Sequence, residues 1–138
     1  MTGVGMTKIG LMLAAALVLG APVAQAQTPA ASISKQVMQK ELLAAPDKEV
    51  TMSTVEYPPG GASPPHRHDA QVFVYVLEGK VNMQVKGGPL LTLGVGDTFY
   101  ENPTDIHIVS ANASKTEPAK ILAVVIKDKG APGSRPAN

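Results

Sequence analysis

Three histidines are the residues of this chain best suited to metal chemistry. They are His66, His68 and His107, and the sequence contains no others. Side chains two positions apart in an extended strand share one face, so His66 and His68 are expected to point the same way. Joined by His107 from a later strand, they could supply three ligands to a divalent transition metal such as Fe, Ni, Cu, Zn or Mn. The alternative is three unrelated polar residues near loops.

Acidic residues near the histidines could assist such a site. Glu101 precedes His107 by six residues, across a turn-rich stretch that could return its carboxylate to the histidines. We expect Glu101 to orient an imidazole or to act as a general base, and the alternative is an exposed turn residue. Asp69 and Asp105, each close to a histidine, have the same two interpretations.

A pocket for a small molecule is expected beside these residues. Its candidate lining is Gln71, Val72, Tyr75 and Tyr100. Tryptophan is absent, and the aromatic residues are three Tyr and two Phe. Sugars commonly stack on such rings, so a carbohydrate ligand is disfavoured.

Strand-forming segments from Glu49 onward must position all of these side chains. Short apolar runs alternate there with Gly, Pro, Asn and Asp, which mark turns. The predicted strands are Glu49–Tyr57, Val72–Leu77, Val81–Val85, Leu90–Leu93, Asp97–Tyr100, His107–Ser110 and Lys120–Lys127. Because no helical segments separate them, they predict an all-β fold built as an antiparallel sandwich or barrel.

The strand Val72–Leu77 is apolar on both of its faces. A strand of this kind is usually covered on both sides. One face is expected to line the barrel interior, and the other then needs a second sheet or a second subunit. This pattern predicts a homodimer.

The segments that flank the strands have a different character. Ser32–Ala45 begins with a Ser cap, ends before Pro46 and has apolar residues at helical spacing, so it predicts a short N-terminal amphipathic helix. Gly130–Asn138 contains two prolines and two glycines and is predicted to be a mobile tail.

The first 26 residues have the features of a secretory signal peptide. Met1–Lys8 carries one positive charge, Ile9–Leu19 is an apolar run of 11 residues, and Ala24-Gln25-Ala26 resembles a cleavage site. The run is shorter than the roughly 20 residues that a membrane span needs, so cleavage is favoured over a membrane anchor. We therefore expect a periplasmic or secreted protein without membrane contact after cleavage. The expected organisation is a signal peptide at 1–26, a linker with a short helix at 27–48, a β-barrel at 49–129 and a flexible tail at 130–138.

Charge and cysteine content limit the classes of partner. Without Lys8 the chain has 11 Lys and Arg against 11 Asp and Glu, and no basic cluster is present. This balance argues against nucleic acid as a partner. Cysteine is absent, so no disulfide supports the fold, and stability must come from packing, a metal or a second subunit.

Two motifs in this chain resemble those of the cupin superfamily. In the first, the family has Gly, five residues, His-x-His, three or four residues, Glu, six residues and Gly. Here Gly60, His66, His68, Val72 and Gly79 stand at these spacings. In the second, the family has Gly, five residues, Pro-x-Gly, two residues, His, three residues and Asn. Here the corresponding residues are Gly96, Asn102, Thr104, His107 and, one place late, Asn112.

The resemblance covers about Glu49 to Lys129 and implies a small double-stranded β-helix, also called a jelly-roll or cupin barrel. It also implies that the three histidines are metal ligands. Val72 stands where the family has its carboxylate ligand. We therefore expect an ion held by three neutral imidazoles, with open positions that favour an anionic ligand such as a carboxylate or enolate.

Three classes of function remain open on this basis. The first is a metal-dependent enzyme of the oxygenase, isomerase or decarboxylase type that acts on a small carboxylated or oxygenated molecule. The second is a non-catalytic protein that binds a small molecule, with or without a metal. The third is a structural or envelope-interaction protein whose histidines have lost their role. The fold alone does not choose among them.

Overall fold

The protein is described here by a computed structural model that covers residues 1–2 and 28–138. The predicted signal peptide, apart from its first two residues, lies outside the described residues. Among the residues described, no helix is long and apolar enough to cross a membrane.

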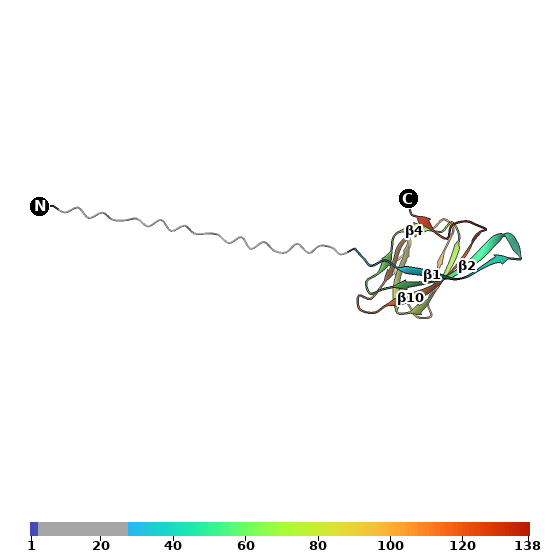
Figure 1. Ribbon diagram of the computed structural model, residues 1–138, viewed down its shortest axis with the longest axis horizontal. Helices are drawn as coiled ribbons and strands as arrows, with labels where there is room; N and C mark the ends of the chain where they lie inside the picture. Colours follow the sequence, from blue (N-terminus) through green and yellow to red (C-terminus); the bar gives the residue numbers. More distant parts are fainter. Residues whose placement is uncertain (3–27) are drawn as a thin grey trace.

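Two antiparallel sheets make up the described part of the chain (Figure 1). The first sheet has the order β1 (Ile33–Leu42), β2 (Ala45–Tyr57), β10 (Ala119–Asp128), β5 (Gln71–Glu78) and β8 (Thr98–Glu101). The second has the order β11 (Arg135–Pro136), β4 (His66–Arg67), β9 (His107–Asn112), β6 (Lys80–Val85) and β7 (Leu91–Gly94), and β3 (Ala62–Ser63) also pairs with β9. Strands distant in sequence are neighbours in each sheet, as in a double-stranded β-helix. The predicted all-β barrel is confirmed.

The hydrophobic core lies between the two sheets. Along β5 the side chains alternate, so Val72, Val74 and Val76 are at most 3% exposed while their neighbours face outward. Val81 and Met83 of β6 are fully buried. Each such side chain contributes about 1.5–3 kcal/mol through removal from water. The apolar face that includes Val72 therefore holds the two sheets together.

The turn between β5 and β6 depends on Gly79. Its φ of 66° lies in the left-handed region, and a Cβ there would lie 2.4 Å from the carbonyl oxygen of Pro118. Only glycine adopts this conformation next to another backbone without strain. Gly79, the last residue of the first motif, thus allows the turn after β5 to lie close to the start of β10.

The predicted helix over Ser32–Ala45 is wrong. Residues Ile33–Leu42 form β1, which pairs with β2 in an antiparallel hairpin. A register shift between Gln36 and Met38 interrupts the alternation, which hides the strand pattern in the sequence. An isolated short helix is marginal in water, whereas pairing with β2 satisfies the backbone along the segment. Figure 1 shows the β1–β2 hairpin reaching beyond the rest of the barrel.

The C-terminal segment, expected to be a mobile tail, packs on the barrel. Arg135 and Pro136 form β11, which pairs with β4. In Figure 1 this segment, in red, lies next to β4. It therefore contacts the strand that carries the first histidine.

The outer face of β5 is open to solvent in the single chain. Phe73, Tyr75 and Leu77 are 44%, 45% and 37% exposed. Phe73 also packs against Tyr100 of β8, with ring centroids 5.1 Å apart. Within the described residues no second sheet covers this face, so the homodimer stays a prediction.

Candidate metal centre

The three histidines lie together at one end of the barrel. His66 begins β4, His68 follows it, and His107 begins β9, where it pairs directly with His66. The ring centroid of His66 lies 4.9 Å from that of His68 and 5.1 Å from that of His107. Phe99 stacks on His107 at 5.6 Å. The β4–β9 pairing thus brings together side chains about 40 positions apart in the sequence.

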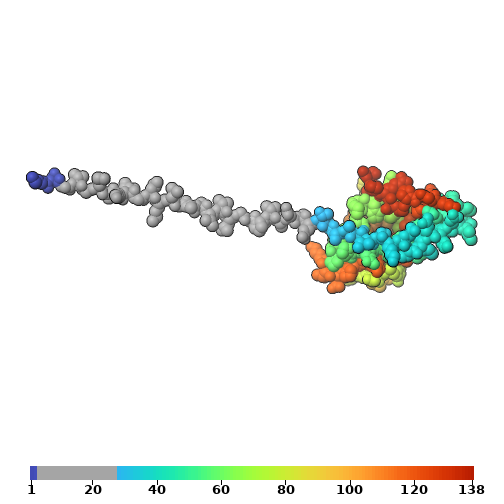
Figure 2. Space-filling view, viewed as in Figure 1, coloured from blue at the N-terminus to red at the C-terminus, as the bar shows by residue number. Residues whose placement is uncertain are grey.

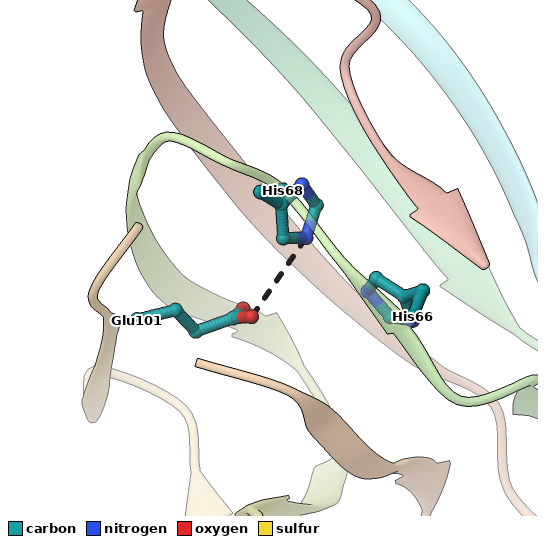
Figure 3. Close-up of side chains that lie close together, drawn as sticks. All are labelled: His66, His68 and Glu101. Atoms are coloured by element: carbon teal, nitrogen blue, oxygen red, sulfur yellow. Dashed lines mark ion pairs between the residues drawn. The ribbon is translucent and has the colours of Figure 1, made fainter. Parts of the chain in front are cut away.

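The carboxylate of Glu101 lies among these imidazoles. Glu101 ends β8 and is 2% exposed. Its Oε1 lies 3.2 Å from Nδ1 of His107, and its Oε2 lies 3.8 Å from Nε2 of His68, the contact dashed in Figure 3. Donor atoms of His66, His68 and Glu101 all lie within 4.8 Å of one another. Two imidazoles and one carboxylate can therefore converge on a single ion, with His107 in contact with the carboxylate.

Backbone carbonyls fix which nitrogen of each imidazole is available. Nδ1 of His66 lies 2.8 Å from the carbonyl oxygen of Pro64, and Nδ1 of His68 lies 2.6 Å from that of Gly133. A carbonyl only accepts hydrogen bonds, so each Nδ1 carries the proton and donates it. Each Nε2 therefore keeps its lone pair, as a metal ligand requires.

Several buried polar atoms at this site lack partners, and this tests whether a metal fits. Within the described part of the chain, both ring nitrogens of His107 and Oε2 of Glu101 are buried without a hydrogen bond. Leaving such atoms unsatisfied costs free energy, and buried polar atoms in proteins nearly always have a partner. An ion coordinated by Oε2 of Glu101 and by one ring nitrogen of His107 would satisfy two of these three atoms. The donor set of imidazole and carboxylate suits a divalent transition metal.

The protonation of His66 also favours metal binding. Burial lowers the pKa of this imidazole below its ordinary value, and the neighbouring His107 and His68 act in the same direction. The hydrogen bond to Pro64 and the carboxylate of Glu101 oppose this effect without reversing it. His66 is therefore neutral at neutral pH, so a metal need not displace a proton from it.

The expectation of a site without a protein carboxylate needs correction. Val72 is buried in the core and lies directly opposite Glu101 in the β5–β8 pairing. Residues directly opposite on antiparallel strands point to the same face, with Cβ atoms about 5 Å apart. The carboxylate missing at position 72 is thus present on the neighbouring strand.

The pocket residues named from the sequence do not gather around the histidines. Tyr75 and Tyr100 lie on the outer face of the sheet, with Phe73, beside a shallow apolar depression. Gln71 is exposed on the same face of β5 as Tyr75. Of the four, Val72 alone points into the barrel. Strand parity separates the two faces once the register is known, and the sequence did not provide that register.

Asp69 and Asp105 also lie outside the group of converging donors. Oδ2 of Asp69 pairs with Nε of Arg135 at 2.8 Å. Oδ2 of Asp105 accepts a hydrogen bond from the backbone N–H of Asn102 at 2.7 Å and closes the turn before His107. Both aspartates stabilise the local backbone next to a histidine.

A cavity of about 400 Å³ opens beside His68. Its polar lining is formed mostly by hydroxyl and amide groups: Ser34, Gln36, Gln39, Thr51, Ser53 and Ser134. The buried pair Glu49 and Lys127 also lines it, and Nζ of Lys127 donates a hydrogen bond to Oε1 of Glu49. The cavity is large enough for a small polar molecule in contact with His68.

Sequence reasoning missed these cavity residues. Glu49 and Lys127 are both at most 6% exposed, on adjacent strands β2 and β10, where they pair directly. The signal available in the sequence was parity, because Glu49 and Thr51 share a face with Tyr57, as Lys127 and Val125 share one with Ile121. Parity could not show that β1 lines the cavity, because this segment was predicted as a helix.

Known structures support the same fold. A protein of Klebsiella pneumoniae with a double-stranded β-helix domain is 22% identical, with a TM-score of 0.61, and the match covers 81% of this chain and 89% of that one. A cupin domain of Bordetella pertussis is 21% identical, with a TM-score of 0.58, over 74% and 99% of the two chains. An oxalate oxidase in complex with glycolate is 24% identical, with a TM-score of 0.58, over 79% and 56%. At these identities the likeness establishes the fold alone.

Sequence comparison points the same way. This chain is 34% identical over 79 residues to the rhicadhesin receptor of Pisum sativum. The match covers 54% of this chain and 36% of that protein, so the chain spans about a third of the length of this relative. Residues 53–125 match the family described as "Cupin domain", and this region contains His66, His68, Glu101 and His107. The chain therefore belongs to the cupin family.

Proposed function

We propose that this protein binds a divalent transition metal through His66, His68, Glu101 and His107 and uses it to act on a small carboxylated or oxygenated molecule. The observation that carries the proposal is the convergence of the Glu101 carboxylate with two imidazoles whose Nε2 atoms are free of hydrogen. His107 has ring nitrogens that are buried without a hydrogen bond in the described structure, and it contacts Glu101, which supports it as a further ligand.

A metal bound there would supply a Lewis acid for an oxygen atom of the substrate. The protein residues would do the remaining work. His66 and His68 hold their Nε2 atoms in place because each Nδ1 proton is fixed on a carbonyl oxygen. Glu101 contributes a negative charge, so a divalent ion keeps one net positive charge at the site. A singly charged anion such as a carboxylate would neutralise it.

The cavity beside His68 supports a hydroxylated ligand of small size. Thr51 and Ser53 of β2 and Ser34 of β1 present hydroxyl groups to it. These groups both donate and accept hydrogen bonds and can orient a hydroxy or keto acid whose other end reaches the metal. The oxalate oxidase among the similar structures binds glycolate, which is such a molecule. We expect the substrate of this protein to belong to the same broad chemical class.

A non-catalytic protein that binds a small molecule is the second candidate. The charged residues that line the cavity beside His68 are Glu49 and Lys127, and they are paired with each other. Among the described lining residues, a free general acid or base is therefore absent. In this version the protein binds the same class of anion without converting it.

One experiment separates the two candidates and tests the metal site. The purified protein is loaded with Fe, Mn, Ni, Cu or Zn and mixed with a panel of small hydroxy and keto acids, with and without dioxygen. Calorimetry measures binding, and mass spectrometry measures product. Product formed by the metal-loaded wild type and not by His66→Ala/His68→Ala supports the enzyme. Saturable binding without product supports the binding protein, and neither binding nor metal uptake would contradict both.

We further propose that the protein is exported and dimeric. The leader at 1–26 supports export. Intact-mass spectrometry of the secreted or periplasmic protein is expected to give the mass of a chain that begins at Gln27. A chain that keeps its first 26 residues would contradict export.

The exposed aromatic face of Phe73, Tyr75 and Tyr100 supports a second copy of the chain as its cover.

A further inference from the structure

The C-terminal segment Gly130–Pro136 lies outside the residues matched by the family and spans the cavity beside His68. Gly130, Ala131, Gly133 and Ser134 form one wall of this cavity. Figure 2 shows the segment, in red, on the surface of the barrel alongside the β1–β2 hairpin.

The segment is anchored at both of its ends. At its start, the backbone N–H of Gly130 donates to Oε1 of Glu49 at 3.2 Å, next to the buried pair with Lys127. At its end, β11 pairs with β4, so that Arg135 lies opposite Arg67 and Pro136 opposite His66. The chain between the two anchors is therefore held across the mouth of the barrel.

A salt bridge fastens the second anchor next to the metal ligands. Nε of Arg135 lies 2.8 Å from Oδ2 of Asp69, the residue that follows His68. Asp69 has a φ of 50°, a left-handed conformation that is uncommon for a residue with a side chain. An exposed ion pair is weak alone, but here the strand pairing and the Gly130 hydrogen bond act with it.

Between the anchors the segment contacts a candidate ligand through its backbone. The carbonyl oxygen of Gly133 accepts the Nδ1 proton of His68 at 2.6 Å. This bond selects the tautomer whose Nε2 lone pair is free and turns that nitrogen toward Glu101. His66 obtains the same support from Pro64, two residues away, whereas His68 obtains it from a residue 65 positions later.

We propose that Gly130–Pro136 is a latch that positions His68 for metal binding and closes one side of the cavity. The proposal rests on the proposed metal site, since it assigns a role through His68. The positioning group is the backbone carbonyl of Gly133, and Arg135 keeps this carbonyl in place through Asp69. Both His66 and His68 are thus oriented for metal binding only when the C-terminal segment is docked.

Two truncations test the latch. One ends at Lys129 and removes the whole latch, and its matched control ends at Pro136 and removes only Ala137 and Asn138. A second pair is Arg135→Gln, which removes the salt bridge, and Arg135→Lys, which keeps a cationic donor for Asp69. Circular dichroism checks that each variant is folded, and the Arg135 pair decides the question if the long truncation does not fold.

The first readout needs no metal. Nitrogen NMR of the imidazoles reports the tautomer of His68, and we expect the Nδ1–H form in the full chain, in the short truncation and in Arg135→Lys. The long truncation and Arg135→Gln are expected to shift His68 toward the Nε2–H form while His66 is unchanged. A His68 signal that is the same in all folded variants would overturn the latch, whatever the metal affinity.

The second readout is metal affinity, measured by competition with a chelator at fixed pH. Loss of the Gly133 carbonyl is expected to weaken binding roughly 10- to 100-fold, as for other groups that orient a metal ligand. Equal affinity in the full chain and the long truncation would also overturn the latch. If the full chain takes up no metal, the metal site fails, and the tautomer of His68 still decides whether the segment positions it.

Discussion

Val72 and Glu101 lie directly opposite each other on the paired strands β5 and β8. Position 72 is where the family motif has its glutamate, and the carboxylate of Glu101 approaches the histidines from the next strand. The two side chains point to the same face of the sheet, so a carboxylate from either strand could reach the same ion. In the proposed metal site the carboxylate therefore comes from β8 instead of from position 72 of β5.

Exchanging the carboxylate between the two strands tests this relationship. Glu101→Gln removes the charge and keeps the shape, so we expect metal affinity to fall by more than the roughly 10- to 100-fold that loss of an orienting group costs. Adding Val72→Glu to this variant is expected to restore part of the affinity. Chelator competition measures both, with the exposed Glu78→Gln as control. Unchanged affinity in Glu101→Gln would show that Glu101 does not bind the metal.

The stability of the fold is expected to decrease in acid because of Glu49. The hydrogen bond from Lys127, together with those from Gln39 and Gly130, lowers the pKa of Glu49 to about 2 from an ordinary value of 4.5. A folded-state pKa below the unfolded value means that the pair stabilises the fold above about pH 4.5 and that this contribution is lost as pH falls toward 2.

Chemical unfolding at several pH values checks this prediction. Glu49→Gln is expected to be less stable at neutral pH, because it leaves Lys127 without its carboxylate, and to lose less further stability between pH 4.5 and 2. The exposed Glu117→Gln serves as the matched control and is expected to follow the wild type. An acid dependence that is the same in Glu49→Gln and wild type would refute the assignment.

Asn112 is expected to be a structural residue. Its side-chain amide donates to the carbonyl oxygens of Tyr57, Pro58 and Glu117 at 2.8–3.1 Å, and its Oδ1 accepts from the backbone N–H of Ser114. Asn112→Ala removes all four of these hydrogen bonds and is expected to lower the free energy of unfolding by about 3 kcal/mol.

Urea unfolding measures this loss, and the exposed Asn102→Ala is expected to change stability by less than about 0.5 kcal/mol. The histidines do not depend on Asn112 for a hydrogen bond, so metal binding by the folded variant should persist. A stable Asn112→Ala would mean that this network contributes little.

The proposed dimer depends on the exposed aromatic face of β5 and β8. Phe73→Glu places a charge on that face, next to Tyr100, and is expected to convert a dimer into monomers. Leu90→Glu, at an exposed apolar residue outside this face, is the control and should not change the assembly. Sedimentation velocity at micromolar concentration distinguishes the two states. A monomeric wild type would refute the proposed dimer.

The sequence was most informative about residues whose neighbours are close in the chain. A run of strand-forming apolar residues located β5 without showing which of its faces is buried, and the motif spacing placed His66, His68 and His107 in one group. Glu101 was a candidate because it precedes His107, but its place beside His68 follows from the pairing of β8 with β5, two strands that are not consecutive. Strand order of this kind is decided by tertiary packing rather than by local pattern.

The errors arose where tertiary pairing overrides the local sequence pattern. The apolar spacing of Ile33–Leu42 suits a helix, and the pairing with β2 overrides it across a bulge. Gly133 and Arg135 have the composition of a tail, and they dock because β4 and Asp69 provide a backbone partner and a charge. The assignment of Tyr75 and Tyr100 to a pocket required the register, and a shift of one residue reverses the face of every side chain.

The metal content of the purified protein is the direct test of the proposed metal centre. The protein is prepared without a histidine tag, and its metals are measured by mass spectrometry beside the His66→Ala/His68→Ala variant. We predict about one transition metal ion per chain in the wild type and none in the variant, since three or four ligands define one site. A wild type that is empty and fails to take up added Fe, Mn, Ni, Cu or Zn would rule out the proposed metal centre.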